Sequence, residues 1–461
     1  MNTHDEDITS RRPEVLVADI GSTITKLSAF AGLESSDVND CKQGPSFLGQ
    51  GMALTTSSEG DVGVGLESAR RDLETRFSLR TSGVPLMVAS SAAGGLRMTV
   101  HGLTRDMTLR AANEASLGAG AIVTFATAGR ISCRDLETIR RIDPNLVLLA
   151  GGVDYGERDV VVANALQLAT LGGSCPVIFA GNKAVIEDVQ CIFTSAHVPI
   201  FSVDNVYPRI DKLNVEPVRE LIQEVFSSHI VTAPGMEKLK ATVVGRIAPT
   251  PGAVMCATEL LAQALGDVMT VDVGGATTDV HSVTEGSPQY RQLSVAPEPR
   301  CKRTVEGDLG VYLNASGIVT AAKADLPDID DLTPIPDSPH RREMSADLTR
   351  WAVDISVWRH AGELRASYGT LGRSDIVEGR DLTAIQYVIG TGGALTRLEN
   401  GREILESIRT DPKNRKLLPP KDAKLLVDRH YIMSAAGVLS QHYPRQALAL
   451  LLDSVALAIP R

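Results

Sequence analysis

The chain has 461 residues, of which 43% are hydrophobic and 22% charged, and it carries a net charge of −10. This length exceeds what one hydrophobic core usually holds, so we expect two or more domains. Because acidic residues are in excess, no broad basic surface can neutralise phosphates, which argues against general binding to nucleic acid or to an anionic membrane. The six cysteines form neither C-x-x-C pairs nor a cluster with histidine, so no zinc or iron–sulfur site is expected and a reduced, cytoplasmic protein is the plain interpretation.

In chain order, residues 1–12 are polar and are expected to form a flexible tail. Three parts follow, at residues 13–130, 131–240 and 241–461. Throughout them, short apolar segments alternate with segments of helical period. The strand-like segments are Val15–Ile20, Leu86–Ala89, Leu146–Ala150, Val177–Ala180, Ile200–Val203, Val268–Val273 and Tyr387–Ile389. This alternation predicts an α/β fold with largely buried sheets, in which residues 131–240 form an inserted α/β unit.

The first informative element is Val17–Lys26, which reads as a buried strand, a tight turn and a second strand. A turn that holds phosphate needs exposed backbone N–H groups, few side chains, and hydroxyls beside it. A carboxylate at the strand end can hold magnesium through water or orient an attacking water. The candidates here are the carboxylate Asp19 and, for nucleotide binding, Gly21, Ser22, Thr23, Thr25 and Lys26. Lys26 either adds charge at the phosphates or points to solvent, because alternate residues of a strand face opposite sides.

Small and polar residues follow three other strand-like segments. Ser90, Ser91, Gly94 and Gly95 come after the first of these, where they either line a cleft or pack closely. In the middle part, Gly151, Gly152 and Asp154 follow one strand and Asn182–Lys183 follows the next. These two turns form either a second ligand or partner site or plain strand-to-helix connections.

The segment Thr270–Asp279 repeats the first hairpin without a gap, since Asp272 aligns with Asp19, Gly274 with Gly21 and Thr278 with Thr25. Two such hairpins suit a phosphate chain held from two sides. The second set of candidates is the carboxylate Asp272 and, for nucleotide binding, Gly274, Gly275, Thr277 and Thr278. Farther on, the charged residues Arg303, Glu306 and Asp308 need partners, either in the cleft or in the fold.

A third glycine turn, Val388–Ala394, follows a strand and precedes a segment of helical character. Gly390, Gly392 and Gly393 would let the backbone approach a base and ribose, with free N–H groups toward the ligand. Such a turn also arises from strand-to-helix packing alone, so it adds weight only together with the two hairpins.

The order of these three motifs resembles the phosphate-1, phosphate-2 and adenosine motifs of the actin, sugar-kinase and heat-shock-chaperone ATPase superfamily. The resemblance implies two ribonuclease-H-like lobes that close on Mg-ATP. It also implies that Asp19 and Asp272 are the metal and water carboxylates, that the glycines and hydroxyls of the two hairpins hold the phosphates, and that Gly392 and Gly393 lie along the adenosine.

A closer resemblance covers nearly the whole chain and points to the glutamate mutase accessory family called GlmL or MutL. It rests on these passages: Ala89–Leu96 (ASSAAGGL), Leu148–Glu157 (LLAGGVDYGE), Asn205–Ile222 (NVYPRIDKLNVEPVRELI), Thr232–Met236 (TAPGM), Pro249–Met255 (PTPGAVM) and Arg303–Gly310 (RTVEGDLG). The resemblance implies a reactivating chaperone for an adenosylcobalamin-dependent mutase, with ATP and Mg²⁺ as cofactors and one or more mutase subunits as partners. Whether several copies of the chain assemble stays open.

Three other functions share the same motifs. A small-molecule kinase or an ATP-dependent amide hydrolase would need an additional base beside the terminal phosphate, and the sequence singles out none. An ATP-driven electron donor would need cysteines that bridge an iron–sulfur cluster, and none are spaced for it. A nucleotide-binding scaffold without hydrolysis remains a further alternative, against which both Asp19 and Asp272 argue.

Overall fold

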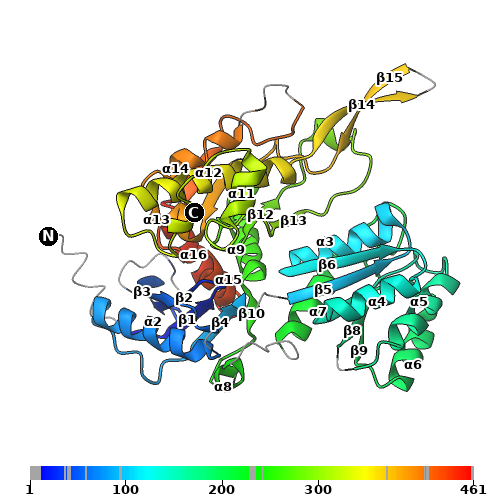
Figure 1. The fold of residues 1–461 in the computed structure, drawn as a ribbon, viewed down its shortest axis with the longest axis horizontal. Helices are drawn as coiled ribbons and strands as arrows, with labels where there is room; N and C mark the ends of the chain where they lie inside the picture. Colours follow the sequence, from blue (N-terminus) through cyan, green and yellow to red (C-terminus); the bar gives the residue numbers. More distant parts are fainter. Residues whose placement is uncertain are drawn as a thin grey trace. The chain divides into compact units, whose positions relative to one another are not determined.

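The computed structural model describes residues 12–35, 38, 43–57, 60–92, 96–173, 175–227, 235–240, 242–369, 372–409, 411 and 415–457. The expected tail of residues 1–12 therefore falls almost wholly outside the described residues, as do Gly94 and Gly95. The chain divides into two compact units (Figure 1). Unit 1 comprises Met1–Ala93, Val231–Val295 and Arg303–Arg461, and unit 2 comprises Gly94–Ile230 and Ala296–Lys302.

The first sheet of unit 1 has the strand order β10-β4-β1-β2-β3 in the described residues. β1, β2 and β3 form an antiparallel meander, and β4 and β10 run parallel to β1. Every residue of β1 is buried, as its apolar sequence predicts for a strand covered on both faces. The strands are β1 (Val15–Ile20), β2 (Ile24–Ala31), β3 (Ser46–Leu54), β4 (Leu86–Ser90) and β10 (Ala248–Pro249).

The second sheet of unit 1 has the strand order β13-β12-β11-β16-β17. This is the order of the first sheet when that sheet is read from β3 to β10. β11 and β12 form the antiparallel hairpin, and β16 and β17 continue parallel to β11. Both sheets thus have the order 3-2-1-4-5 of a ribonuclease-H-like lobe, which confirms the predicted fold class. The strands are β11 (Val268–Val273), β12 (Thr278–Val283), β13 (Cys301–Glu306), β16 (Tyr387–Thr391) and β17 (Lys424–Val427).

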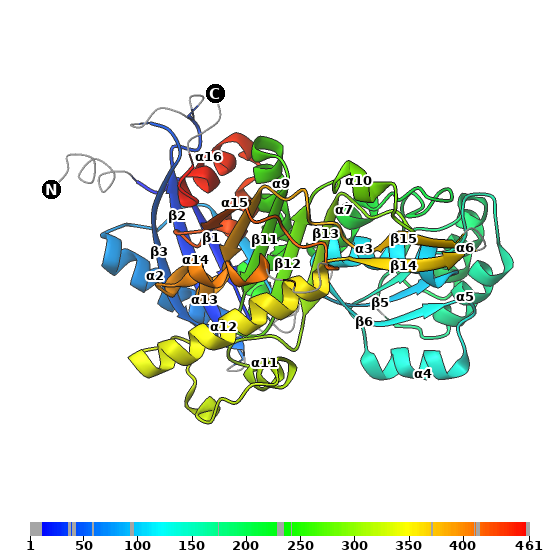
Figure 2. The same ribbon diagram turned by 90° about the horizontal axis from the view of Figure 1, so that it is seen from above.

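Helices cover these sheets. α2 (Val62–Phe77) lies on the first sheet against β2 and β3, and its N-cap Asp61 accepts a hydrogen bond from the Gly63 N–H (Figure 1). α12 (Pro339–His360) crosses one face of the second sheet (Figure 2). The other helices and helical turns of unit 1 are α8 (Met236–Lys240), α9 (Thr250–Leu265), α10 (Pro288–Arg291), α11 (Ala315–Ala322), η6 (Ile329–Asp331), α13 (Gly392–Arg397), α14 (Gly401–Ile404), η7 (Ser407–Arg409), α15 (Met433–Leu439) and α16 (Pro444–Ser454).

Close packing of α9 and α15 brings distant parts of the sequence together. A Cβ atom at Gly437 would lie only 1.8 Å from the Ala253 carbonyl oxygen, so only glycine permits this approach. The small-residue run Ala435–Gly437 therefore serves helix packing. This contact fixes the start of α15 beside the end of β1.

Unit 2 contains a five-stranded parallel sheet of order β6-β5-β7-β8-β9 in its described residues. This is the doubly wound order 2-1-3-4-5. The segment 131–240 contributes β7, β8 and β9, while β5 and β6 precede it in the sequence. The elements are β5 (Leu96–Gly102), η3 (Arg105–Leu109), α3 (Arg110–Gly118), β6 (Ala121–Ala128), α4 (Cys133–Ile142), β7 (Leu146–Leu149), α5 (Asp159–Ala169), β8 (Val177–Phe179), η4 (Lys183–Val185), α6 (Ile186–Ser195), β9 (Ile200–Ser202) and α7 (Glu216–Val225).

The turns after β7 and β8 are tied together by buried amides. The Asn182 side chain accepts from the N–H groups of Tyr155 and Ala184 and donates to the Glu157 carbonyl. Asn205 donates to the Gly152 carbonyl and to Asp154. These bonds give structural partners to Asn182, which follows β8, to Asn205, which follows β9, and to Asp154 in the turn after β7.

A two-stranded ribbon, β14 (Glu363–Gly369) and β15 (Gly372–Glu378), extends from the second sheet's half of unit 1 (Figure 1). Its base is held by hydrogen bonds to neighbouring extended segments, from Leu364 N–H to the Arg415 carbonyl and from Val295 N–H to the Val377 carbonyl. Across the described ranges, no helix combines the length and apolar character needed to cross a bilayer.

Candidate functional site

The turns of the two hairpins have the same backbone hydrogen bond and lie against each other. Gly21 N–H donates to the Ile24 carbonyl at 3.0 Å, and Gly274 N–H donates to the Thr277 carbonyl at 2.9 Å. A Cβ atom at Gly275 would come within 2.8 Å of the Thr23 hydroxyl oxygen. The two motifs that the sequence aligns are therefore neighbours in space within unit 1.

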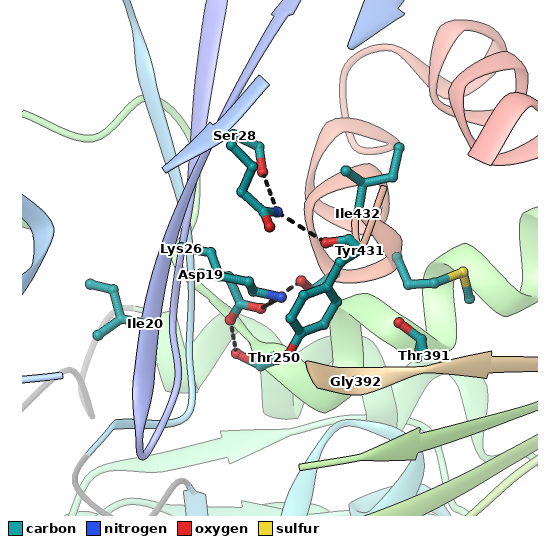
Figure 3. A network of polar contacts seen from close by, with 12 residues as sticks. Asp19, Ile20, Lys26, Ser28, Thr250, Thr391, Gly392, Tyr431 and Ile432 are labelled. Carbon is teal, nitrogen blue, oxygen red and sulfur yellow. Dashed lines mark hydrogen bonds and ion pairs between the residues drawn. The ribbon is translucent and has the colours of Figure 1, made fainter. Parts of the chain in front are cut away.

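Asp19, at the end of β1, is buried and fully engaged (Figure 3). One carboxylate oxygen accepts from the Thr250 hydroxyl at 2.7 Å. The other accepts from the Ser434 hydroxyl at 2.6 Å and pairs with Lys26 Nζ at 3.0 Å. Burial raises the pKa of Asp19, but Lys26 and the two hydroxyls outweigh burial, so the pKa lies below its ordinary value. Asp19 is held as an anion by residues from β2, α9 and α15.

Lys26 is only 4% exposed, so it does not point to solvent. It lies opposite Asp19 in the β1–β2 register, and its ammonium sits 3.3 Å above the centroid of the Tyr431 ring (Figure 3). Burial lowers the pKa of Lys26, but Asp19, Tyr431 and Asp272 raise it above the ordinary value overall. The ammonium therefore stays charged inside the protein.

Asp272 is different, because it is partly exposed and makes no hydrogen bond or ion pair within the described part of the chain. Burial, Asp279 and Asp19 raise its pKa, Lys26 opposes them, and the result is about 7. Its cross-strand neighbour in the β11–β12 register is Asp279. A carboxylate left unpaired beside another acid is suited to take up a cation or a proton from a ligand.

The third turn closes on the second hairpin. Gly392 has φ +88°, and a Cβ atom there would lie 2.2 Å from the Val273 carbonyl oxygen and 2.7 Å from Asp272 Oδ1. The preceding Thr391 donates to the buried Asp428 at 2.9 Å. Gly393 follows at the start of α13, whereas Gly390 lies within β16 beneath Leu395 and Leu405. Gly390 thus faces the core, Gly392 lies beside Asp272, and Gly393 lies near the Tyr431 side chain.

The predicted hydroxyls divide into two groups. Thr25 bonds Thr55, and Thr278 donates to the Leu309 carbonyl, and both are buried. Ser22 is exposed, and Thr277 donates to Asp279 at 3.1 Å. The Thr23 hydroxyl oxygen is shielded from solvent and has no hydrogen-bond partner in the residues described. Ser22, Thr23 and Thr277 are the hydroxyls that lie at the turns.

The charged residues after the second hairpin pair with side chains of β12 and α12. Arg303 is 1% exposed and binds Asp279 at 2.6 Å. Glu306 and Asp308 both pair with Arg359 of α12. These contacts give the three residues structural partners.

Five residues that contact the site were not singled out from the sequence: Gln50, Thr250, Asp428, Tyr431 and Ser434. Thr250 begins α9 within the passage Pro249–Met255, and Ser434 lies just before Ala435–Gly437. Asp428 follows β17, a strand of only four residues that begins with a lysine and comes shortly after Pro419 and Pro420, so the sequence pattern did not predict it. The only available signal for Asp428 was its place after an apolar segment.

The residues present fit a nucleotide with its metal. The turns are cradles that a Cβ atom would fill at Gly21 and Gly275, and Thr23 offers an unused hydroxyl. Asp272 is the carboxylate open to a cation, because both oxygens of Asp19 are already engaged. Within the described residues, no group of three or more acidic, histidine or cysteine side chains gathers to hold a metal ion.

Comparison with known proteins defines the family. A family model described as MutL protein matches residues 15–455. The chain belongs to the MutL protein family. A member from Clostridium tetanomorphum, Protein MutL, is 33% identical over 462 residues, covering 95% of this chain and 98% of that protein.

Solved structures resemble the chain only distantly. An acetone carboxylase matches with a TM-score of 0.37 at 11% identity, covering 93% of this chain and 70% of its own. A glycerol dehydratase reactivase matches with a TM-score of 0.36 at 10% identity, covering 92% and 99%. The xylulose kinase from Bifidobacterium adolescentis matches with a TM-score of 0.28 at 11% identity, covering 97% and 95%. The fold of this MutL family member therefore rests on its own strand order.

Proposed function

We propose that the chain binds Mg-ATP where the three turns of unit 1 meet and hydrolyses it slowly. One observation carries the proposal: Thr23 lies against Gly275, and Gly392 lies against Asp272. The two hairpins and the third turn are thus neighbours, as this proposal requires of turns that bind one nucleotide. Hairpins with a purely structural role would not need to lie together around the unpaired carboxylate of Asp272.

In this proposal the N–H groups of the two turns and the hydroxyls of Ser22, Thr23 and Thr277 hold the phosphates. Lys26 supplies a fixed positive charge. Asp272 would hold the metal and orient the attacking water, and its carboxylate must be ionised for both roles. When bound, Mg²⁺ would neutralise charge on the phosphate oxygens. Turnover is expected to be slow because only carboxylates and hydroxyls position the water.

We further infer that the client is an adenosylcobalamin-dependent mutase of the glutamate mutase or aminomutase type, and that the chain reactivates it. Membership of the MutL family supports this inference, since the resemblance implies an accessory role for such mutases. A mutase that has lost its adenosyl group holds a damaged cobalamin, and its release requires a packed interface to open. ATP and ADP states that bind the mutase with different affinity would supply the necessary free energy.

The first experiment is thermal unfolding of the purified chain with Mg-ATP, with Mg-ADP and without ligand. A ligand that binds only the folded state stabilises it by about 3 kcal/mol at a concentration 100-fold above its Kd. We expect stabilisation by ATP that is weaker in Asp272→Ala and unchanged in Asp347→Ala, which removes a surface carboxylate paired with Arg350. If neither nucleotide stabilises the chain, the proposed nucleotide site is refuted.

Two activity measurements separate the remaining parts of the proposal. Phosphate release should be abolished in Asp272→Ala while ATP binding persists, and unchanged release would remove Asp272 from the mechanism. The client is tested with a mutase loaded with damaged cobalamin. Wild-type chain with Mg-ATP should release the cobalamin, as followed by absorbance, and Asp272→Ala should not. Equal release of cobalamin by wild type and Asp272→Ala would mean that ATP binding without hydrolysis is sufficient for release.

A further inference from the structure

Tyr431 occupies a connecting position that neither hairpin motif predicts. It lies between β17 and α15 in a left-handed backbone conformation with φ +54°, which is costly for a residue with a side chain. Its N–H donates to the Asp428 carbonyl at 3.0 Å, and its carbonyl accepts from Gln50 of β3 at 3.1 Å. The backbone of Tyr431 is thus held between β3 of the first sheet and Asp428, the residue that follows β17 of the second sheet.

The anchors of this segment are themselves buried. Asp428 is fully buried and accepts from Thr391 and from the N–H groups of Ile432 and Met433. Gln50 is 4% exposed, and it also donates to Ser28 of β2 and accepts from Arg397 of α13. The strained conformation is therefore over-determined by hydrogen bonds at both ends, which is how proteins retain strain that serves a site.

The side chain of Tyr431 spans from the first hairpin to the third turn. Its ring carries the Lys26 ammonium at 3.3 Å from the centroid (Figure 3). Its hydroxyl lies 3.8 Å from where a Cβ atom of Gly393 would be. One aromatic side chain thus contacts the charged residue of the phosphate hairpin and lies beside the turn expected to follow the adenosine.

This arrangement fixes the direction in which Lys26 can act. An ammonium group has three N–H donors. Asp19 accepts one at 3.0 Å, and the electron-rich face of the Tyr431 ring covers a second side. We propose that Tyr431 is a positioning residue that, together with Asp19, holds Lys26 so that its remaining donor meets the phosphates of the bound nucleotide. This inference rests on the proposed function.

The test compares ligands with and without phosphates on the full-length chain. A cation–π contact of this kind is worth enough to change affinity by about 2- to 30-fold. Tyr431→Leu should weaken Mg-ATP and Mg-ADP binding by that factor and leave adenosine binding unchanged, whereas Tyr431→Phe should bind all three like wild type. Equal loss for adenosine and ATP would mean that Tyr431 only shapes the adenosine turn, and would overturn the inference.

A double-mutant cycle with Lys26→Met isolates the contact between the two side chains. If Tyr431 acts through Lys26, Tyr431→Leu should have no further effect on ATP affinity in the Lys26→Met background. Additive losses would overturn the inference. ATP binding by wild type is measured first, because its absence would refute the proposed function itself. Unimpaired ATP binding by Tyr431→Leu would refute only the role of Tyr431.

A shape-conserving series guards against misfolded variants. Phenylalanines of increasing fluorination, introduced at position 431, keep the ring in place while they withdraw electrons from its face. Affinity for Mg-ATP should fall stepwise along the series while adenosine affinity stays constant. A flat series for Mg-ATP would show that the ring face contributes nothing and would refute the proposal.

Discussion

The two hairpins share their sequence pattern and their turn hydrogen bond, yet their carboxylates differ in chemical state. Asp19 is buried, bonded to Thr250, Ser434 and Lys26, and has a pKa below its ordinary value. Asp272 has no such partners in the described structure, and its pKa is raised to about 7 by burial and by neighbouring acids.

The difference arises mainly from the residue across the hairpin. Asp19 faces Lys26 in its register, and Asp272 faces Asp279. An opposite charge favours the ionised carboxylate, and a like charge disfavours it. A duplicated motif has thus produced one fixed anion, suited to holding other groups in place, and one responsive carboxylate, suited to a cation or a reacting water. Four substitutions should break or sharpen this contrast.

The largest effect is expected for Lys26→Met, which removes one partner of a buried ion pair and leaves Asp19 uncompensated. Such a loss costs about 3–5 kcal/mol of unfolding free energy. Chemical denaturation, followed by a probe in unit 1, measures it. The matched control is Lys183→Met, because Lys183 is 44% exposed and pairs with Asp204 at the surface of unit 2. That change should cost less than about 1 kcal/mol. A small loss for Lys26→Met would show that Asp19 finds other compensation.

Gly274→Val tests the shared geometry of the turns. A Cβ atom at position 274 would lie 3.1 Å from the Thr277 carbonyl oxygen, and the two methyl groups of valine would add further bulk to this tight turn. We expect Mg-ATP affinity to fall by at least about 100-fold, equivalent to roughly 3 kcal/mol. Gly307→Ala is the control, since a Cβ atom there meets nothing within 4 Å. Calorimetric titration with wild-type affinity for Gly274→Val would contradict the phosphate-hairpin interpretation.

The sequence alone predicts the two hairpins but not the residues that surround them. The aspartates, glycines and hydroxyls could be aligned because they are local, and the alternation of strands and helices sufficed for the α/β class. The partners of Asp19 could not be found this way, since Thr250 and Ser434 lie 231 and 415 residues away in the chain.

Strand alternation also left Lys26 with two orientations, because periodicity gives the face of a strand and not what covers that face. Here Tyr431 covers it. Likewise, Gly390 fits the glycine pattern of the third turn but lies in β16 against Leu395.

The boundaries at residues 130 and 240 remain predictions. The pairing of β5 with both β6 and β7 depends on contacts between segments that are not adjacent in sequence.

Thr250→Val tests whether the hydroxyls around Asp19 stabilise its charge. The change keeps the side-chain volume and removes a hydrogen bond to an ionised carboxylate, which is worth about 1.5–3 kcal/mol. We expect that loss in unfolding free energy at pH 7, together with a rise in the pKa of Asp19. Thr277→Val is the matched change on the second hairpin, where the hydroxyl donates to Asp279 and not to Asp272. Its cost should be smaller, because this hydrogen bond is longer, at 3.1 Å against 2.7 Å, and Asp279 also pairs with Arg303. Equal costs would remove the contrast between the hairpins.

Asp272→Asn is the one change of the four that is expected to stabilise the protein. The pKa of Asp272 rises from 3.8 to about 7 on folding, so between these values the folded state binds more protons than the unfolded state. Stability contributed by this group is therefore full below pH 4 and is lost as pH rises through 7. Asparagine cannot ionise, so Asp272→Asn should be more stable than wild type at pH 8, by at least about 1 kcal/mol since one pKa unit is worth 1.4 kcal/mol. The difference should vanish at pH 4, whereas a variant less stable than wild type at pH 8 would mean that Asp272 is ionised and paired like Asp19.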